Sequence, residues 1–148
     1  MILGYKKFFP WGVPTNFKAK ILSGKKKHSL RQDKKNRWIT GRKIQHAHEV
    51  RTKNYDHFAD GECKSVQKIE IYSPEILIAN GFNYTYYFTK RAIWSYKYFV
   101  VLVDEKALEW KEIVTLAHND GFETTHDFFR WFSNGFEGKI IHFTDLKY

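Results

Sequence analysis

A short basic stretch, residues 24–31, holds the side chains best suited to chemistry in this chain. An amine, a hydroxyl and a guanidinium follow one another at Lys26, Ser29 and Arg31. Amide hydrolysis needs a base or nucleophile, a proton relay and a positive group where the carbonyl oxygen gains charge. Lys26 can act as base or nucleophile only if its amine is partly neutral, and neighbouring cations lower its pKa in that direction. The same cations could instead contact a phosphate, so both alternatives stay open.

The elements that must position these residues are a short helix and a strand. Residues 16–23 place apolar side chains at helical spacing and precede a glycine, which is typical of a helix end. Residues 27–31 then alternate as a strand does, which sends Ser29 and Arg31 to one face and His28 to the other. Ser29 and Arg31 are therefore expected to point the same way.

The remaining elements are mostly short strands. Apolar patterns predict strands at residues 42–50, 62–72, 98–103 and 139–146 and a helix at residues 108–118. Thr124 and Asp127 resemble a capping box that begins another helix. Short strands with two or three helices, without regular βαβ alternation, predict a mainly β protein with helices, an α+β fold built as a small β-barrel. A chain of 148 residues is expected to form one domain.

The basic stretch resembles the signature of the ASCH domains, a branch of the PUA-like RNA-binding barrels. That signature is Gly-x-Lys-x-x-Thr-x-Arg behind Ile-Leu-x-Gly; residues 17–24 read Phe-Lys-Ala-Lys-Ile-Leu-Ser-Gly, and residues 24–31 read Gly-Lys-Lys-Lys-His-Ser-Leu-Arg. Residues 36–44 and the end of the chain also resemble the family, whereas residues 74–98 match nothing in it. The resemblance implies a single PUA-like domain over residues 1–148, flanked by two or three helices, with an aromatic-rich insert at about residues 74–98.

The resemblance also implies a site. In ASCH proteins the Lys, Thr and Arg of the signature line a cleft, and an acidic residue before the last helix faces them. The corresponding residues are Lys26, Ser29, Arg31 and Asp120, which are expected to converge on one solvent-accessible cleft. Small bacterial amidohydrolases of this superfamily remove the acetyl group from N4-acetylcytidine with a Lys, a Thr and a Glu at these places, which makes Lys26, Ser29 and Asp120 the catalytic candidates. Because Asp is shorter than Glu, and Ser replaces Thr, binding is favoured over hydrolysis.

Positive charge is concentrated in the first half of the chain. Residues 1–74 hold 17 Lys and Arg against 6 Asp and Glu, a net charge of +11, whereas residues 75–148 have a net charge of −2. Such a concentration attracts polyanions, which predicts RNA or a nucleoside or nucleotide as partner; a solvated face, or a module that binds an acidic protein, is the alternative. The candidate binding cations are Lys25, Lys26, Lys27, Arg31, Arg37, Arg42 and Lys43.

Aromatic side chains are concentrated in residues 82–99, which contain nine of them with three cations in between. Bases stack on such rings while cations hold the backbone. Tyr84, Tyr86 and Trp94, together with Trp38, are the candidates for contacting bases. The alternative is a strand hairpin that packs its aromatic residues into the core.

Other features exclude several classes of protein. Cys63 is a single cysteine, so neither an intramolecular disulfide nor a cysteine zinc site is expected. Residues 46–48 read His-Ala-His, but no third ligand has suitable spacing, and no glycine-rich phosphate loop is present, so neither a metal nor a cofactor is expected. The start lacks the pattern of a signal peptide, and the longest apolar run is far too short to cross a membrane. A cytoplasmic protein without a membrane partner is therefore expected, and its oligomeric state is left open.

Overall fold

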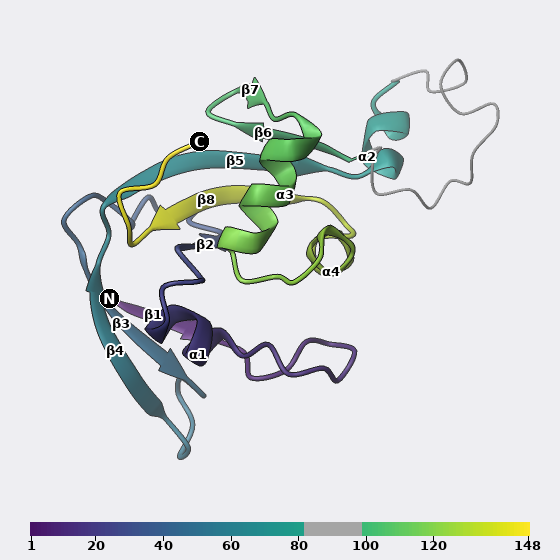
Figure 1. Ribbon diagram of the computed structural model, residues 1–148. Helices are drawn as coiled ribbons and strands as arrows, with labels where there is room; N and C mark the ends of the chain where they lie inside the picture. Colours follow the sequence, from purple (N-terminus) through teal and green to yellow (C-terminus); the bar gives the residue numbers. More distant parts are fainter. Residues whose placement is uncertain (82–98) are drawn as a thin grey trace.

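The computed structural model describes residues 1–81 and 99–148 (Figure 1). In these two ranges eight strands form two sheets and four helices accompany them, which is an α+β architecture. In chain order the strands are β1 (Ile2–Tyr5), β2 (His28–Arg31), β3 (Lys43–His48), β4 (Asp56–Glu62), β5 (Ser65–Tyr72), β6 (Val100–Val103), β7 (Lys106–Ala107) and β8 (Phe136–His142). The helices are α1 (Phe17–Leu22), α2 (Pro74–Ala79), α3 (Trp110–Asn119) and α4 (Thr125–Trp131).

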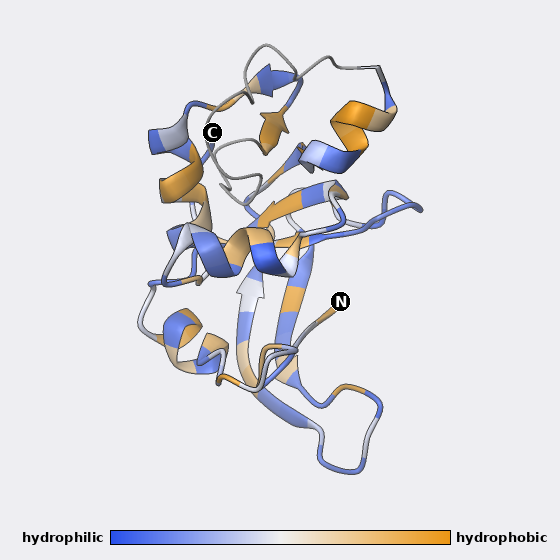
Figure 2. Ribbon diagram, turned by 90° about the vertical axis from the view of Figure 1, so that its right-hand side faces the viewer, coloured by the Kyte–Doolittle hydropathy of each residue, from blue (hydrophilic) through white to orange (hydrophobic). Residues whose placement is uncertain are grey.

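The smaller sheet has the strand order β1-β3-β4. β1 pairs in parallel with β3, and Leu3 and Tyr5, which alternate along β1, are both buried. β3 pairs antiparallel with β4, and their register shifts between His46 and Ala47. The shift lets Ala47 and His48 follow His46 as three buried residues in a row, which strict alternation would not allow. The connection between β3 and β4 is largely hydrophilic (Figure 2).

The larger sheet is antiparallel and has the order β2-β8-β5-β6-β7. The chain enters it at a corner after β4. The amide of Cys63 donates to the carbonyl of Arg42 at 2.8 Å, while the amide of Lys64 donates to the carbonyl of His142 at 2.8 Å. One residue therefore continues the pairing with β3 and the next begins the pairing with β8, and Cys63 is fully buried at the corner.

The structure confirms the predicted α+β class, but no closed barrel is detected in the part of the chain that it describes. Closure requires every edge strand to hydrogen-bond to another strand. Within residues 1–81 and 99–148, β1 and β4 both pair with β3 alone, and β2 pairs with β8 alone. The change of partner at Cys63 thus produces two sheets with free edges instead of one closed ladder.

α3 and α4 accompany the larger sheet, whereas α1 lies beside the smaller one (Figure 1). α3 lies across the face of the larger sheet, with α4 beside the end of β8 (Figure 1). α3 buries Ile113, Leu116 and Ala117, which lie at helical spacing, whereas Trp110 is 40% exposed. The predicted cap of α4 is confirmed in part, because the Thr124 hydroxyl accepts from the amide of Asp127 at 3.1 Å.

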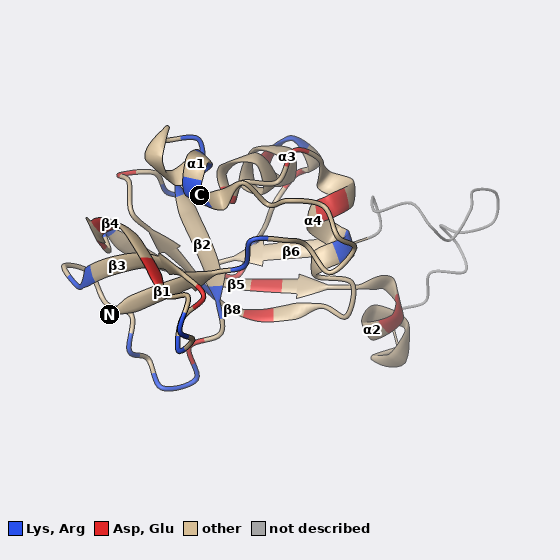
Figure 3. Ribbon diagram, turned by 90° about the horizontal axis from the view of Figure 1, so that it is seen from below, with Lys and Arg blue, Asp and Glu red and all other residues tan. Residues whose placement is uncertain are grey.

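Basic and acidic side chains lie mainly on different elements of the structure. Lys and Arg lie mainly on the loops around β1, β2 and α1, whereas acidic positions mark β5, β8, α2 and α4 (Figure 3). None of the helices described in residues 1–81 and 99–148 is long and apolar enough to cross a membrane.

Candidate functional site

Two segments far apart in sequence lie together at the centre of the candidate site. α1 ends at Leu22 with Ser23 as its C-cap, and Gly24 has the positive φ of 74° that glycine adopts readily at a helix end. The chain then turns back, with the amide of Lys26 donating to the carbonyl of Lys20 at 2.9 Å. The amide of Lys27 donates to the carbonyl of Asn119 at 2.7 Å, which places the start of β2 beside the end of α3. This contact brings the signature residues to the end of α3.

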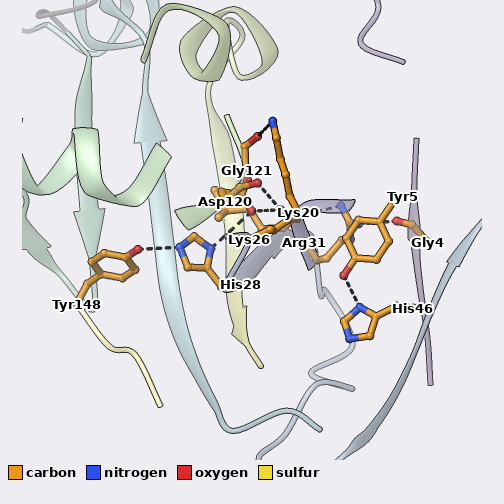
Figure 4. Close-up of polar contacts among 11 residues, drawn as sticks. Gly4, Tyr5, Lys20, Lys26, His28, Arg31, His46, Asp120, Gly121 and Tyr148 are labelled. Carbon is orange, nitrogen blue, oxygen red and sulfur yellow. Dashed lines mark hydrogen bonds and ion pairs between the residues drawn. The ribbon is translucent and has the colours of Figure 1, made fainter. Parts of the chain in front are cut away.

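Lys26 and Asp120 form a buried ion pair (Figure 4). The Lys26 Nζ donates to Asp120 Oδ1 at 2.6 Å and also to the Asp120 carbonyl oxygen. The expected proximity of these two residues is confirmed. The expected solvent-accessible cleft is wrong for this pair, because Lys26 is 2% exposed and Asp120 is 4% exposed.

Burial and pairing act in opposite directions on the two charges. Burial lowers the pKa of Lys26 to about 8, although the carboxylate of Asp120 favours the protonated amine. Burial also opposes ionisation of Asp120, but the positive charge of Lys26 and hydrogen bonds from its neighbours outweigh this, so the pKa of Asp120 is lowered. At neutral pH the pair is therefore mainly ionic, with a small fraction of neutral amine.

Aromatic rings form the wall on the other side of the Lys26 amine. The Nζ lies 4.6 Å from the centre of the Phe17 ring and 5.9 Å from that of Tyr5. The Arg31 guanidinium lies 5.3 Å from the same Tyr5 ring and donates to the carbonyl of Gly4 at 2.5 Å. Cation–π contact thus joins Lys26 and Arg31 through Tyr5, and burial raises the pKa of the Tyr5 phenol, which stays neutral.

His28 belongs to the site although sequence reasoning did not select it. Its Nδ1 lies 3.6 Å from Asp120 Oδ1, and its Nε2 lies 2.7 Å from the hydroxyl of Tyr148. The Asn119 amide donates to that hydroxyl at 3.0 Å. Burial lowers the pKa of His28, so the ring is neutral. The only sequence signal was the position of His28 two residues after Lys26, and nothing in the sequence indicated Tyr148.

Ser29 and Trp38, two of the predicted site residues, are both buried. Ser29 is 2% exposed, and among the described residues no hydrogen bond joins its hydroxyl to Lys26 or Asp120. Strand alternation places Ser29 on the opposite face of β2 from His28, which is the residue that faces Asp120. The prediction that Trp38 contacts bases is wrong for this structure, because Trp38 is 5% exposed and belongs to the hydrophobic core. Tyr84, Tyr86 and Trp94 lie outside the described residues.

The two histidines of β3 lie next to Tyr5. His46 Nδ1 is 2.8 Å from the Tyr5 hydroxyl, and His48 Nδ1 is 3.0 Å from the Tyr5 carbonyl oxygen. Burial lowers the pKa of His46 to about 4, so that ring is neutral. No group of three His, Cys, Asp or Glu residues in residues 1–81 and 99–148 is arranged to hold a metal ion.

A surface cleft of about 480 Å³ is lined by the chain neighbours of Lys26 and Asp120, although neither residue of the pair lines it. Lys20, Lys25, Lys27 and Gly121 are among its lining residues. The Lys20 Nζ donates to the carbonyl of Gly121 at 2.7 Å, and a Cβ at Gly121 would lie 3.1 Å from Lys26 Cδ. Gly121 therefore lies between the cleft and the Lys26 side chain. Three lysines line the cleft around it.

The other predicted binding cations do not line this cleft. Lys43 is exposed and pairs with Glu62 at 2.9 Å, and Arg42 donates to the sulfur of Met1 at 3.4 Å. The amide of Arg37 donates to the carboxylate of Asp33 at 2.9 Å, while its side chain is exposed. Of the predicted cations, the structure thus gathers Lys25, Lys26, Lys27 and Arg31 around the site and leaves three elsewhere.

The site lies in an α+β protein of two open sheets. Comparison of the chain with protein-family models, with curated proteins and with solved structures finds no match. Only the residues of the site therefore bear on its function.

Proposed function

We propose that the chain is an ASCH-type, PUA-like domain that binds RNA or a modified nucleoside in the cleft beside Lys26 and Asp120. One observation carries the proposal. The cleft of about 480 Å³ has three lysines in its lining and is lined by the chain neighbours of both residues of the buried ion pair that the ASCH resemblance indicates. Its size falls in the range of small-molecule sites, which is about 300–1,000 Å³.

The cations of this cleft differ in their freedom to meet a ligand. Lys25 is exposed and Lys27 is half-buried, whereas Lys20 pairs with Glu123 at 2.8 Å. Lys26 is enclosed and cannot reach a phosphate in this conformation. We therefore assign phosphate contact to Lys25 and Lys27. The Lys26–Asp120 pair stabilises the segments that carry them.

Salt dependence tests binding of RNA. Affinity for a single-stranded oligonucleotide, measured by filter binding, should fall with salt with a log-log slope of about −0.7 for each phosphate neutralised. Replacing Lys25 and Lys27 by Ala should weaken binding and make the slope shallower. The matched control replaces the exposed Lys106 and Lys111 by Ala, which removes the same charge outside the cleft. Binding that ignores salt, or an equal loss in both double variants, would contradict the proposal and favour a protein-interaction module.

A second function, hydrolysis of an acylated nucleoside such as N4-acetylcytidine, has one observation in its favour. Burial lowers the pKa of Lys26 to about 8, and Asp120 orients its amine at 2.6 Å. At that pKa about a tenth of the amine is neutral near neutral pH, which is what a base or nucleophile requires. The two points against it are the enclosure of Lys26 and the lack of contact between Ser29 and the pair.

Lys26→Arg separates the two functions. Guanidinium keeps its proton, since its pKa exceeds about 12, so the variant retains the cation but cannot supply a neutral amine. If the protein only binds, affinity should stay within a few-fold. If it hydrolyses N4-acetylcytidine, chromatography should show turnover by the wild type that Lys26→Arg abolishes, whereas Lys25→Ala, which alters an exposed lysine of the cleft lining, should chiefly weaken substrate binding.

A further inference from the structure

The loop between β1 and α1 holds an aromatic ring out to solvent. Phe8 is 56% exposed, although hydrogen bonds hold the loop around it. The amide of Phe9 donates to the carbonyl of Val13 at 2.8 Å, and the amide of Thr15 donates to the carbonyl of Lys7 at 2.9 Å. Phe8 also forms an isolated β-bridge with Pro14. The exposure of Phe8 is therefore built into a hydrogen-bonded loop.

The neighbouring aromatic residues fix the direction in which Phe8 points. Phe9 is 7% exposed and stacks on Trp11, with ring centres 4.8 Å apart and an angle of 2° between the planes. The Arg130 guanidinium covers Trp11 at 4.4 Å from the ring centre. Because Phe9 provides the anchor in the core, Phe8 remains available for a partner without any rearrangement of the loop. Such preorganisation lowers the entropy cost of binding.

Phe8 stands between two hollows of the surface. One has a volume of about 450 Å³ and the other about 520 Å³, and both are lined by Lys7 and Phe8. Tyr5 also lines the first and Phe17 the second, and these are the two rings that contact the Lys26 amine. The Phe8 surface therefore begins directly outside the wall of the candidate site.

Charge around this surface favours a polyanion. Lys6 and Lys7 are exposed and form no salt bridge within residues 1–81 and 99–148. Two carboxylates lie nearby: Asp56 lines the second hollow but pairs with Lys18 at 2.9 Å, and Glu49 lines the first. Lys6 and Lys7, which form no salt bridge within these ranges, therefore lie directly beside the Phe8 ring.

We infer that Phe8 is a stacking platform for a base of a single-stranded nucleic acid, with Lys6 and Lys7 contacting the adjoining phosphates. This inference rests on the proposed function and extends it from the cleft to a longer strand. An exposed ring with a hollow on each side suits a flat base, which can lie in a hollow and stack on the ring. A lipid surface would need a convex apolar tip and has no use for the hollows.

Substitutions at Phe8 test the ring separately from its apolar area. Phe8→Leu keeps an apolar side chain but has no π face, whereas Phe8→Trp enlarges that face, and neither disturbs the core because the residue is exposed. With fluorescently labelled oligouridylate, Phe8→Leu should bind about tenfold more weakly than wild type, while Phe8→Trp should bind at least as tightly. Oligodeoxythymidylate, measured in parallel, shows whether the strand must be RNA.

Photocrosslinking gives a second readout. After ultraviolet irradiation of the wild-type complex and digestion with trypsin, the nucleotide should be attached to the peptide of residues 8–18, which contains the ring. If wild type binds neither oligonucleotide, the proposed binding of RNA fails and the inference fails with it. If wild type binds but Phe8→Leu binds equally well, the inference alone is overturned. Loss of binding to anionic phospholipid vesicles in Phe8→Leu, with unchanged binding to the oligonucleotides, would also overturn it.

Discussion

Replacing Asp120 by Asn should destabilise the protein by an amount that shrinks as pH rises. In the wild type, Lys26 Nζ lies 2.6 Å from Asp120 Oδ1, and both side chains are buried. Burial lowers the pKa of Lys26 from 10.5 to about 8, and the carboxylate opposes that decrease. Asn keeps the size and an acceptor oxygen but carries no charge, so the pKa of Lys26 should fall further in the variant.

The magnitude follows from the proton on Lys26. With a pKa of about 8, the protonated amine is favoured over the neutral one by about 1 kcal/mol at about pH 7. The variant loses this amount when Lys26 becomes neutral, and about 1 kcal/mol more when a charged hydrogen bond becomes a neutral one. The expected loss is therefore about 2 kcal/mol at about pH 7. At about pH 9.5 the wild-type amine is itself mostly neutral, and only about 1 kcal/mol should remain.

The sign agrees with proton linkage. A lysine whose pKa is lowered by folding binds fewer protons in the folded state than in the unfolded state between its two pKa values, so stability rises with pH in that window. For the wild type the window runs from about 8 to 10.5. In Asp120→Asn this window begins at lower pH. The stability of the variant should therefore already rise with pH below about pH 8, where Lys26 of the wild type does not make stability depend on pH.

Urea unfolding followed by tryptophan fluorescence measures both proteins at the two pH values. Asp145→Asn is the control, because that carboxylate is exposed, and its effect should stay within about 0.5 kcal/mol. A loss of stability in Asp120→Asn that is equal at the two pH values, or greater at the higher one, would refute the account of a buried amine whose charge Asp120 maintains.

Two further substitutions probe the surroundings of the pair. Gly121→Ala should lower the free energy of unfolding by about 1–3 kcal/mol, because Gly121 has a φ of 91° and an added Cβ would lie 3.1 Å from both Lys26 and Phe17. The control, Gly41→Ala, has a similar φ of 83° but open space around it, and should cost about 1 kcal/mol. Equal losses in urea unfolding would contradict the packing argument. Tyr148→Phe should lower the free energy of unfolding by about 1–2 kcal/mol, because the Tyr148 hydroxyl contacts both His28 and Asn119. The control, Tyr55→Phe, alters an exposed ring and should leave stability almost unchanged. Unchanged stability in Tyr148→Phe would show that its hydroxyl is not needed.

Local patterns were enough to predict the elements around the signature. α1 and β2 depend on residues close in sequence, namely an apolar helical stripe, a glycine at its end and an alternating strand. β1 escaped prediction because it has four residues and its parallel partner β3 lies some 40 residues farther along the chain. β4 escaped because Asp56–Glu62 is only partly buried and lacks the β-branched residues that mark strands. α2 also escaped prediction; Pro74 begins it behind the Ser73 cap.

The site itself required information that spacing does not contain. Alternation along β2 correctly separated His28 from Ser29, yet which face meets Asp120 depends on how α3 docks beside β2. Asp120 was indicated by family resemblance, and its contact with Lys26 joins residues 94 positions apart. Tyr5 reaches the site through parallel pairing of β1. Trp38 was predicted to contact bases, but its ring is buried in the core.

The sequence and the structure assign different causes to the low pKa of Lys26, and salt distinguishes them. Crowding by Lys25 and Lys27 would be screened by salt, so the pKa would rise towards its ordinary value as ionic strength increases. In the structure burial is the largest cause, opposed by Asp120, with smaller contributions from Arg31 and Lys20. Burial is not screened, and Lys26 is 2% exposed, so its pKa should stay close to 8 at low and at high ionic strength. The NMR titration of the Lys26 ε-carbon, assigned by comparison with Lys26→Arg, measures this pKa directly. A pKa that climbs towards 10.5 with added salt would mean that the amine is open to solvent, and the site would then be an exposed basic cleft after all.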